Sequence, residues 1–461
     1  MSKEFIVVDT NIPLLDANHI VTLGSEGAVV CIPETVIDEL DSKKSGLNEL
    51  AYQARSFGRL IAKAKQLPRT TKDTLNIAKF EVEGNEVWIV SSTVYPDLSK
   101  IALNIRNDRK IIEIALLLDK AKFGNITFMS NDVMCRIRAD SLGLPVTDFK
   151  VVDKVDYEFT RTLEVDDYTF RNLHGKDITE IDPNHLIEHY NYKFTTPTSG
   201  QVKLATINNE TINILGKDTE KELHRQDVTP ANGDQLLLAR AIQDPAIDLV
   251  VCEALAGSGK TLTSLSNAMR LVKTNSPYTN ILYVRASIND VEEIEEVGFL
   301  PGSVDEKNAV YFHPLYDSLD FIARKRFNNK KLKPKELEEK VETEIEKITQ
   351  DYNIEALTGL GMRGRTFRDT IVIIDEVQGM SKSSLQKVLT RMGKNCKIIL
   401  IGSNNQIDNP NMTRYTNGLS VILNDCATVI GEKINKHVVP LERVARSDFA
   451  EYAERLFSKE R

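Results

Sequence analysis

The sequence predicts an α/β protein in which two domains with parallel sheets flank a small β-rich segment. Apolar, strand-like runs alternate with helical stretches in both the N-terminal and the C-terminal part. A glycine-rich loop joins one such run to a helix, and aromatic residues alternate at strand period in the middle of the chain. We place the three parts at residues 1–150, 151–226 and 227–461.

The composition is that of a globular protein. The chain has 461 residues, of which 41% are hydrophobic and 27% charged, enough for several domains and a substantial core. No apolar stretch approaches the length of a membrane span, and Met1–Glu4 lead straight into a strand-like run, unlike a signal peptide. We therefore expect no membrane contact.

The cysteines and the net charge exclude several classes of protein. The 5 cysteines are scattered and form no CxxC pair, so neither a zinc site nor a disulfide framework is indicated. A cytoplasmic, reducing compartment fits this pattern. The formal net charge of −8 excludes a broadly basic surface, so a nucleic acid would have to bind in a local groove or pore.

A loop with the sequence ALAGSGKT, at residues 254–261, predicts a phosphate-binding site. It follows the apolar run 247–252 and opens a helix that we expect over 261–274. Glycines let backbone N–H groups turn toward phosphates, Lys260 can reach the β- and γ-phosphates, and Thr261 can hold Mg²⁺. The predicted nucleotide-binding residues here are Ala256, Gly257, Ser258, Gly259, Lys260, Thr261 and Leu262.

The partner of this loop should be a buried strand that ends in an acid. Residues 370–374 are apolar after Thr370 and lead into Asp375 and Glu376, as expected of a central parallel strand beside a nucleotide. Asp375 would bind the Mg²⁺ shell, and Glu376 would orient or deprotonate the attacking water. Together with the loop, this strand predicts an ATPase site.

Four acids in the N-terminal part follow the same logic. Asp9 ends a strand, Glu39 lies on a helix that starts at Pro33, and Asp132 caps a helix after the strand 126–129. Asp108 belongs to a segment, 107–110, that we expect to open a helix reaching about Lys122. Because the carboxyl ends of parallel strands meet at one crevice, the four acids should converge.

Converging carboxylates repel one another unless cations neutralise them. Mg²⁺ or Mn²⁺ takes such oxygen ligands, and two ions can activate a water and stabilise the leaving oxygen in phosphodiester hydrolysis. Taken singly, Asp108 and Asp132 could be helix caps, and Glu39 could lie on a solvated helix face. Taken together, Asp9, Glu39, Asp108 and Asp132 predict a metal-dependent nuclease site.

Residues 1–150 resemble PIN-domain ribonucleases. The resemblance rests on Asp9-Thr10-Asn11, the helix of Glu39, Asn107-Asp108-Arg109 and Ser130-Asn131-Asp132, in this order and spacing. It implies a three-layer α/β/α domain, a four-acid site and an RNA substrate. No residue in the sequence identifies a ribose 2′-hydroxyl, so the choice of RNA over DNA rests on the resemblance.

The middle of the chain predicts a small β-rich connector. Tyr190, Tyr192 and Phe194 alternate at strand period, and the runs 202–207 and 211–215 flank Asn208-Asn209 like the strands of a hairpin. Exposed aromatics could stack on bases. The favoured interpretation is that they fill the connector's own core.

The C-terminal part, from about Thr229 to Phe457, resembles the PhoH family of P-loop ATPases, which are related to superfamily-one helicases. The segments 298–302, 314–317 and 363–366 carry this resemblance. With the PIN-like part it implies ATP-dependent RNA unwinding joined to ribonuclease activity, in a homo-oligomeric ring, a hexamer. It further implies adenine reading by Gln235, γ-phosphate sensing by Gln406 and an arginine finger at Arg446, with Arg443 as the alternative.

Two positions depart from the family pattern. Ser403 stands where the family usually has Asp, and Val377-Gln378-Gly379 stands where it commonly has Ala-Gln-Asn. Neither change removes an expected metal ligand or the expected base. They concern the coupling between ATP hydrolysis and movement.

Two basic segments could contact RNA. The first, with Arg324-Lys325-Arg326 and Lys330, Lys331 and Lys333, is interpreted as a solvated insertion rather than a phosphate grip. Arg363 and Arg365 are the better candidates for RNA or phosphate contact, because they lie one strand length from Asp375.

The sequence thus predicts an ATP-dependent RNA helicase or translocase coupled to a metal-dependent endoribonuclease. The alternatives are a nuclease switched by ATP without translocation, a nuclease that cuts DNA, and a scaffold that binds both ligands without turnover. The expected cofactors are ATP and Mg²⁺, with Mn²⁺ possible at the nuclease site.

Overall fold

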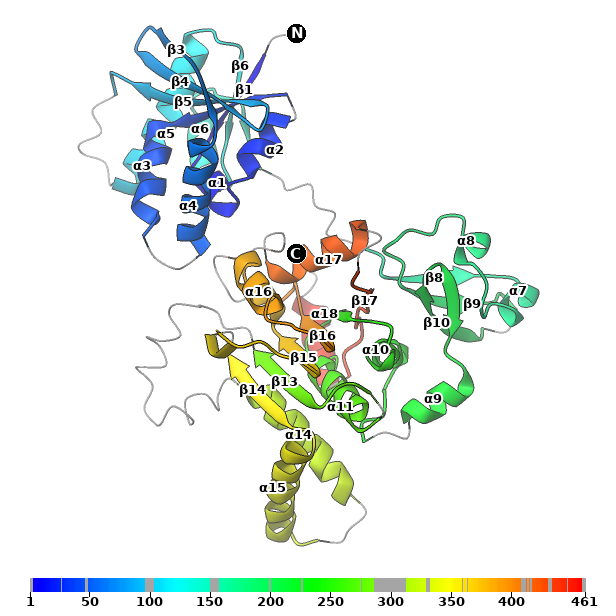
Figure 1. Ribbon diagram of the computed structural model, residues 1–461. Coiled ribbons are helices and arrows are strands. Elements are labelled where there is room, and N and C mark those ends of the chain that lie inside the picture. The colour runs from blue at the N-terminus through cyan, green and yellow to red at the C-terminus, as the bar shows by residue number, and fades with distance from the viewer. Residues whose placement is uncertain are drawn as a thin grey trace. The chain divides into compact units, whose positions relative to one another are not determined.

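A computed structural model describes most of the chain, and its described residues form two compact units, Met1–Val152 and Asp153–Arg461. Each unit is described by itself (Figure 1). The described residues are 3–25, 27–45, 49–95, 103–149, 157–198, 200–224, 227–274, 276–285, 312–328, 332–358, 360–362, 364–407, 412, 414, 417–429, 433–445 and 447–457.

The first unit is a mixed α/β domain around one sheet, with strand order β3-β4-β5-β2-β1-β6-β7. Strands β5, β2, β1, β6 and β7 are parallel, while β3, β4 and β5 form an antiparallel meander. Its elements are β1 (Glu4–Val8), α1 (Asn11–Leu15), α2 (His19–Ser25), β2 (Val29–Pro33), α3 (Glu34–Lys43), α4 (Glu49–Ala62), β3 (Lys65–Lys72), β4 (Leu75–Val82), β5 (Asn85–Ser92), α5 (Leu103–Lys120), β6 (Asn125–Met129), α6 (Val133–Asp140) and β7 (Val146–Thr147).

The sequence interpretation of this unit needs one correction. Asp108 was expected at the opening of a helix near a strand end, but α5 already begins at Leu103, so Asp108 lies inside the helix. The residues from Leu103 to Arg106 include no proline or glycine, so nothing stops the helix from starting before the Asn107-Asp108 pair. The predicted helix of Glu39 and the predicted cap at Asp132 are present.

The described residues of the second unit form two sheets. The larger one is entirely parallel, with strand order β14-β13-β15-β16-β12-β17. Its elements and the helices around it are α10 (Gly233–Gln243), β12 (Leu249–Glu253), α11 (Lys260–Lys273), β13 (Asn280–Arg285), α14 (His313–Phe327), α15 (Pro334–Asp351), β14 (Ile354–Thr358), η1 (Leu360–Met362), β15 (Thr370–Asp375), η2 (Val377–Gly379), α16 (Lys382–Leu389), β16 (Cys396–Gly402), α17 (Gly418–Thr428), β17 (Lys436–Val438) and α18 (Asp448–Phe457).

Both faces of the parallel sheet are covered, which explains why its strands are apolar throughout. Successive side chains of a strand point to opposite faces, so Ile371 and Ile373 pack on the side of α10, α11 and α14, whereas Val372 and Ile374 pack on the side of α16 and α17. Figure 1 shows these two layers of helices on either side of β13, β15 and β16. The predicted α/β fold class is confirmed.

The smaller sheet has the order β11-β10-β9-β8. The predicted hairpin is present, since β10 and β11 are antiparallel and are joined by Asn209 and Glu210, both with positive φ. The connector elements are β8 (Thr160–Glu164), α7 (Asp167–Arg171), α8 (Ile178–Ile181), β9 (Asn191–Thr195), β10 (Val202–Asn208), β11 (Thr211–Ile214) and α9 (Lys217–His224).

The aromatic residues of the connector mainly fill its core, as the favoured interpretation expected. Tyr192 and Phe194 are fully buried and stack with ring centroids 5.2 Å apart. Other side chains attach the connector to the parallel sheet: Asn191 Nδ2 donates to the carbonyl of Val438 at 2.7 Å, and Tyr190 OH donates to that of Cys426 at 2.8 Å. The connector therefore packs as part of the second unit.

The basic segment at the end of α14 is neutralised by neighbouring acids. Arg324 forms ion pairs with Asp320 and Glu338, and Arg326 with Asp227 and Glu344. These pairs favour the structural interpretation of this segment over a phosphate grip.

Two expectations from composition can be examined in the described residues. All five cysteines are free thiols, so no disulfide is present. Among the helices that the structure describes, none combines the length and the apolarity that crossing a membrane requires.

Gly402, at the end of β16, is a site of close packing. A Cβ atom there would lie 2.5 Å from Gln378 Oε1 and 3.1 Å from Leu419 Cδ2. We expect Gly402→Ala to lower the free energy of unfolding by about 1–2 kcal/mol through overpacking. Gly216→Ala is the control, because nothing lies within 4 Å of its added Cβ. Chemical denaturation measures both, and equal midpoints would contradict this packing.

Candidate functional site

The loop between β12 and α11 has the backbone that a phosphate site needs. Gly257 and Gly259 have φ values of 70° and 83°, which only glycine adopts without strain. The free N–H groups of the first turn of α11 include that of Leu262, whose side chain packs on the core. Ser258 is buried, and its hydroxyl has no hydrogen-bond partner among the described residues. A buried, unpaired hydroxyl in such a loop fits a phosphate ligand.

The loop and the acid strand meet as the sequence predicted. Thr261 Oγ1 donates to Asp375 Oδ2 at 3.0 Å, and Lys260 Nζ lies 3.2 Å from Glu376 Oε1. These residues are more than 100 positions apart in the sequence and come together because β12 and β15 flank β16 in the sheet. The predicted metal-binding pair, Thr261 and Asp375, is therefore in direct contact.

Asp375 is completely buried, and a residue that the sequence analysis missed holds it. Burial raises the pKa of Asp375, and the neighbouring Glu376 charge raises it further. Tyr283 OH, on β13, donates to Asp375 Oδ2 at 2.6 Å. Tyr283 is opposite Ile373 in the β13–β15 register, so its ring reaches diagonally to the residue two positions further on. The only sequence signal was a tyrosine among the aliphatic residues of the segment 281–284.

Glu376 has an unusual, left-handed backbone conformation, and Lys260 balances its charge. Its φ of 58° lies in the left-handed region, which a non-glycine residue adopts at some energetic cost. Burial alone would raise the pKa of Glu376, but Lys260 and a hydrogen bond from Gln378 outweigh it and lower the pKa. Glu376 is therefore held ionised, as a base or a water-orienting group must be.

Gln378, which lies in the segment that departs from the family pattern, connects Glu376 to the end of β16. Its Nε2 donates to Glu376 Oε2 at 2.6 Å and to the carbonyl of Gln406 at 2.9 Å. Its Oε1 accepts from the backbone N–H of Ser403 at 3.0 Å. The side chain of Gln406 is exposed. A movement at Ser403 or Gln406 would thus reach Glu376 through one side chain.

Gln235 is close to the phosphate loop, but its amide is engaged by the backbone. Its Nε2 donates to the carbonyl of Ser258 at 2.8 Å, and its Oε1 accepts from the N–H of Ala231 at 2.7 Å. In this arrangement Gln235 supports the loop. Reading an adenine would require it to exchange one of these hydrogen bonds.

Several predicted residues lie outside the described part of the chain. They are Arg446, Arg363, Lys330, Lys331 and the segment 298–302. The alternative finger, Arg443, is exposed after β17, and this segment touches the loop through Ala445 N–H, which donates to the carbonyl of Gly257 at 2.9 Å. Arg365 is paired with Glu355 at 2.6 Å, at the opposite end of β15 from Asp375.

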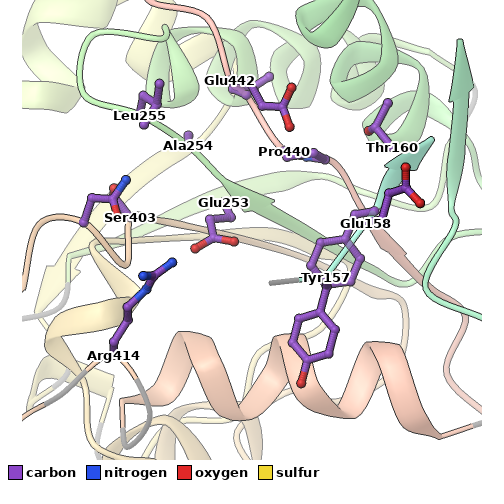
Figure 2. Close-up of a pocket in the computed structure, with 13 residues that line it drawn as sticks. Tyr157, Glu158, Thr160, Glu253, Ala254, Leu255, Ser403, Arg414, Pro440 and Glu442 are labelled. Carbon is purple, nitrogen blue, oxygen red and sulfur yellow. The ribbon is translucent and has the colours of Figure 1, made fainter. Parts of the chain in front are cut away.

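A cavity of about 540 Å³ lies beside Ala254 and Leu255, where the phosphate loop begins. Figure 2 shows side chains of Glu253, Arg414 and Tyr157 around it, with Ser403 on one side. Glu158, Glu253 and Glu442 give it three carboxylates against the single guanidinium of Arg414. This charge disfavours phosphate groups, so the cavity is not an extension of the phosphate site.

In the first unit, Asp9 is the buried centre of the predicted acid cluster. It is 6% exposed, and its carboxylate accepts hydrogen bonds from Ser130 Oγ at 2.6 Å and Asn11 Nδ2 at 2.7 Å. Burial raises the pKa of Asp9 to about 6, and the charges of Asp108 and Glu39 add to this effect. Asp9 is therefore close enough to Asp108 and Glu39 for their charges to affect its pKa.

Each of the other three acids has a neighbour that holds it. Arg138 Nη1 lies 2.5 Å from Asp108 Oδ2, Asn107 Nδ2 donates to Glu39 Oε1 at 2.7 Å, and Asp132 caps α6 by accepting from the N–H of Met134 at 2.7 Å. Burial raises the pKa of Asp108 while Arg138 lowers it, and Asp132 and Glu39 raise it. Arg138 was not identified from the sequence, where it looked like any surface helix residue.

This donor set fits a hard divalent cation by type and by charge, since its groups are oxygens that raise one another's pKa values. The hydroxyl of Thr10, next to Asp9, is also buried without a partner among the described residues. Within the described ranges, however, no three acidic, histidine or cysteine side chains converge closely enough to hold one ion. Arg138 supplies the positive charge at Asp108 instead, so binding a cation would require Asp108 to exchange this partner.

Comparisons with known proteins identify both parts of the chain. A family model described as PIN domain matches residues 6–150, and one described as PhoH-like protein matches residues 227–458. The chain thus joins a PIN domain to a PhoH-type P-loop domain.

The similarity extends over nearly the whole chain. Proteins named PhoH2 from Bacillus subtilis (strain 168), Thermobispora bispora and Mycolicibacterium smegmatis are 30%, 23% and 23% identical to it. These alignments cover 92%, 90% and 96% of this chain and 93%, 89% and 94% of those proteins. The chain belongs to the PhoH-like protein family.

The raised pKa of Asp9 predicts how the first unit responds to pH without divalent metal. The folded-state pKa of about 6 exceeds the ordinary value of 3.8, so the folded chain binds this proton more tightly than the unfolded chain. Stability is therefore highest below 3.8 for this group and falls as the pH rises to about 6. Asp9→Asn should remove this cost and stabilise the metal-free protein at pH 8 by about 1–3 kcal/mol.

Calorimetry in EDTA at pH 5 and pH 8 measures this effect. Asp41→Asn, an exposed acid on α3, is the control and should leave the melting temperature unchanged. If Asp9→Asn melts at or below the wild-type temperature at pH 8, the buried carboxylate of Asp9 does not destabilise the folded protein, and the prediction is wrong.

The hydrogen bond from Tyr283 predicts a specific effect on ATP turnover. Tyr283→Phe keeps the ring but leaves Asp375 Oδ2 with one donor fewer, so kcat should fall about tenfold while KM for ATP changes little. Tyr278→Phe is the control, because Tyr278 is also buried but precedes β13, at the opposite end of this strand from Asp375. ATPase assays over a range of Mg²⁺ concentrations decide, and wild-type turnover by Tyr283→Phe at every concentration would refute the role of this hydroxyl.

Proposed function

We propose that this chain couples an ATP-driven RNA motor to a divalent-metal-dependent endoribonuclease. The observation that carries the motor half is the direct contact of Lys260 and Thr261 with Glu376 and Asp375. A phosphate loop and an acid pair in this relation are what ATP hydrolysis requires. The nuclease half rests on the electrostatic interaction among Asp9, Asp108 and Glu39. Beyond the effect of burial, the charges of their acidic neighbours raise the pKa values of Asp9 and Asp108.

At the ATP site, each residue has a distinct task. The loop residues 256–262 bind the phosphates, with Lys260 neutralising charge at the β- and γ-phosphates. Thr261 and Asp375 would hold Mg²⁺, which supplies charge stabilisation to the transferred phosphoryl group. Glu376 orients the attacking water. Gln378 is hydrogen-bonded to Glu376, Gln406 and Ser403, so a movement of Gln406 or Ser403 would shift Glu376. We assign the arginine finger to Arg446, donated by a neighbouring copy in a homo-oligomeric ring, a hexamer.

At the nuclease site, Asp9, Glu39, Asp108 and Asp132 would hold Mg²⁺ or Mn²⁺, which supplies an activated water and stabilises the leaving oxygen. Ser130 and Asn11 fix the orientation of Asp9 through its Oδ2 atom. Arg138 holds Asp108 when no cation competes for it. RNA is proposed as the substrate on the family resemblance, and the free thiols fit a cytoplasmic location.

Cleavage of labelled single-stranded and hairpin RNA, each with and without ATP and with Mg²⁺ or Mn²⁺, tests this proposal. Asp9→Asn should abolish all cleavage, while Lys260→Ala should lose only the ATP-dependent cleavage of the hairpin. Asp41→Asn and Lys273→Ala are matched controls outside the sites and should behave as the wild type.

The possible failures of this proposal are distinct. Intact RNA under every metal condition would refute the nuclease. Faster cleavage of a single-stranded DNA of the same sequence would identify DNA, and not RNA, as the substrate. Hairpin cleavage by Lys260→Ala at the wild-type rate would refute the coupling.

A further inference from the structure

His19 and Phe149 form an aromatic pair in the first unit. His19 begins α2, and Phe149 follows β7; their ring centroids are 4.3 Å apart and the rings are tilted by 37°. Both side chains are half-buried. Phe149 packs against the core of the unit, and His19 Nδ1 lies 3.3 Å from the carbonyl oxygen of Ile12. The two rings are therefore fixed in place while part of each remains accessible.

A series of hydrogen bonds connects the backbone of Phe149 to Asp9. The backbone N–H of Phe149 donates to Asn131 Oδ1 at 2.9 Å, and the backbone N–H of Asn131 donates to Asn11 Oδ1 at 3.1 Å. Asn11 Nδ2 then donates to Asp9 Oδ2 at 2.7 Å. The position of Phe149 is thus set by the same two asparagines that border the acids.

The sheet places the pair at the same edge as the acids. Strands β1, β6 and β7 are adjacent and parallel, so the residues that follow them emerge side by side. Phe149 follows β7, two strands from β1 and Asp9, which is a lateral distance of about 10 Å. A nucleotide next to the one at the acids could bring its base to the pair.

We propose that His19 and Phe149 form a stacking subsite for one unpaired nucleobase, next to the phosphodiester at the acid cluster. The proposal rests on the proposed nuclease function and specifies its substrate as single-stranded. Aromatic rings stack on any base, so the subsite accepts all four bases with small differences. A base inside a duplex keeps its faces covered by its neighbours and cannot enter, so the subsite selects against paired substrate.

Binding tests the subsite independently of cleavage. The full chain carrying Asp9→Asn is mixed in EDTA with a fluorescent single-stranded RNA, and Kd is measured by anisotropy with and without further substitutions. Phe149→Leu, which keeps apolar packing, and His19→Ala should each weaken binding about tenfold. Phe149→Trp and His19→Phe restore a ring and should bind as tightly as the Asp9→Asn chain. Unchanged Kd values for Phe149→Leu and His19→Ala would overturn the subsite.

An RNA that lacks one base localises the contact. In wild-type protein with metal, an abasic nucleotide next to the cut should raise KM by about the same factor as Phe149→Leu, with kcat little changed. Phe149→Leu should then show no additional loss on the abasic RNA, because both changes remove one contact. Fully additive losses would overturn the subsite even if cleavage is normal. If the wild type cleaves nothing while anisotropy still shows the Phe149 effect, the nuclease proposal fails and the base subsite stands.

Discussion

Parallel strands deliver their last residues to a single edge of a sheet, and a carboxylate buried at that edge requires positive or hydrogen-bonding partners. Both units depend on this constraint. Asp9 follows β1 and Asp375 ends β15, and each is almost or completely buried. Hydrogen bonds stabilise both carboxylates: Asp9 accepts one from Ser130, and Asp375 accepts one each from Thr261 and Tyr283.

The two sites balance their charges differently, and this difference matches their proposed chemistry. At the ATP site, Lys260 lies beside Glu376, so the acid pair has a counter-charge within the protein and the base stays ionised. At the nuclease site, Arg138 forms an ion pair with Asp108, and the side chains that donate to Asp9 among the described residues, Ser130 and Asn11, are neutral. Burial raises the pKa of Asp9, and the charges of Asp108 and Glu39 raise it further; this excess of negative charge favours a divalent cation.

Local sequence patterns predicted the features that depend on nearby residues. The glycine loop, the strand ending in Asp375, the cap at Asp132 and the hairpin of the connector follow from short-range backbone rules. Tyr283 and Arg138 were missed because their roles depend on neighbours far away in the sequence. The start of α5 was misplaced because Asn107-Asp108 looks like a helix cap, whereas the residues before it also favour a helix. The meander of β3, β4 and β5 was not predicted, although Glu83-Gly84, between β4 and β5, is a turn signal.

The central claim is that ATP turnover delivers structured RNA to the nuclease. The most direct test is the rate of cleavage within the stem of a hairpin RNA by the wild-type chain, compared between ATP, a non-hydrolysable ATP analogue and no nucleotide. Our expectation is that the stem is cleaved only when ATP is present, whereas single-stranded RNA is cut in all three conditions. Equal stem cleavage with the analogue would contradict it, because binding without turnover would then be sufficient.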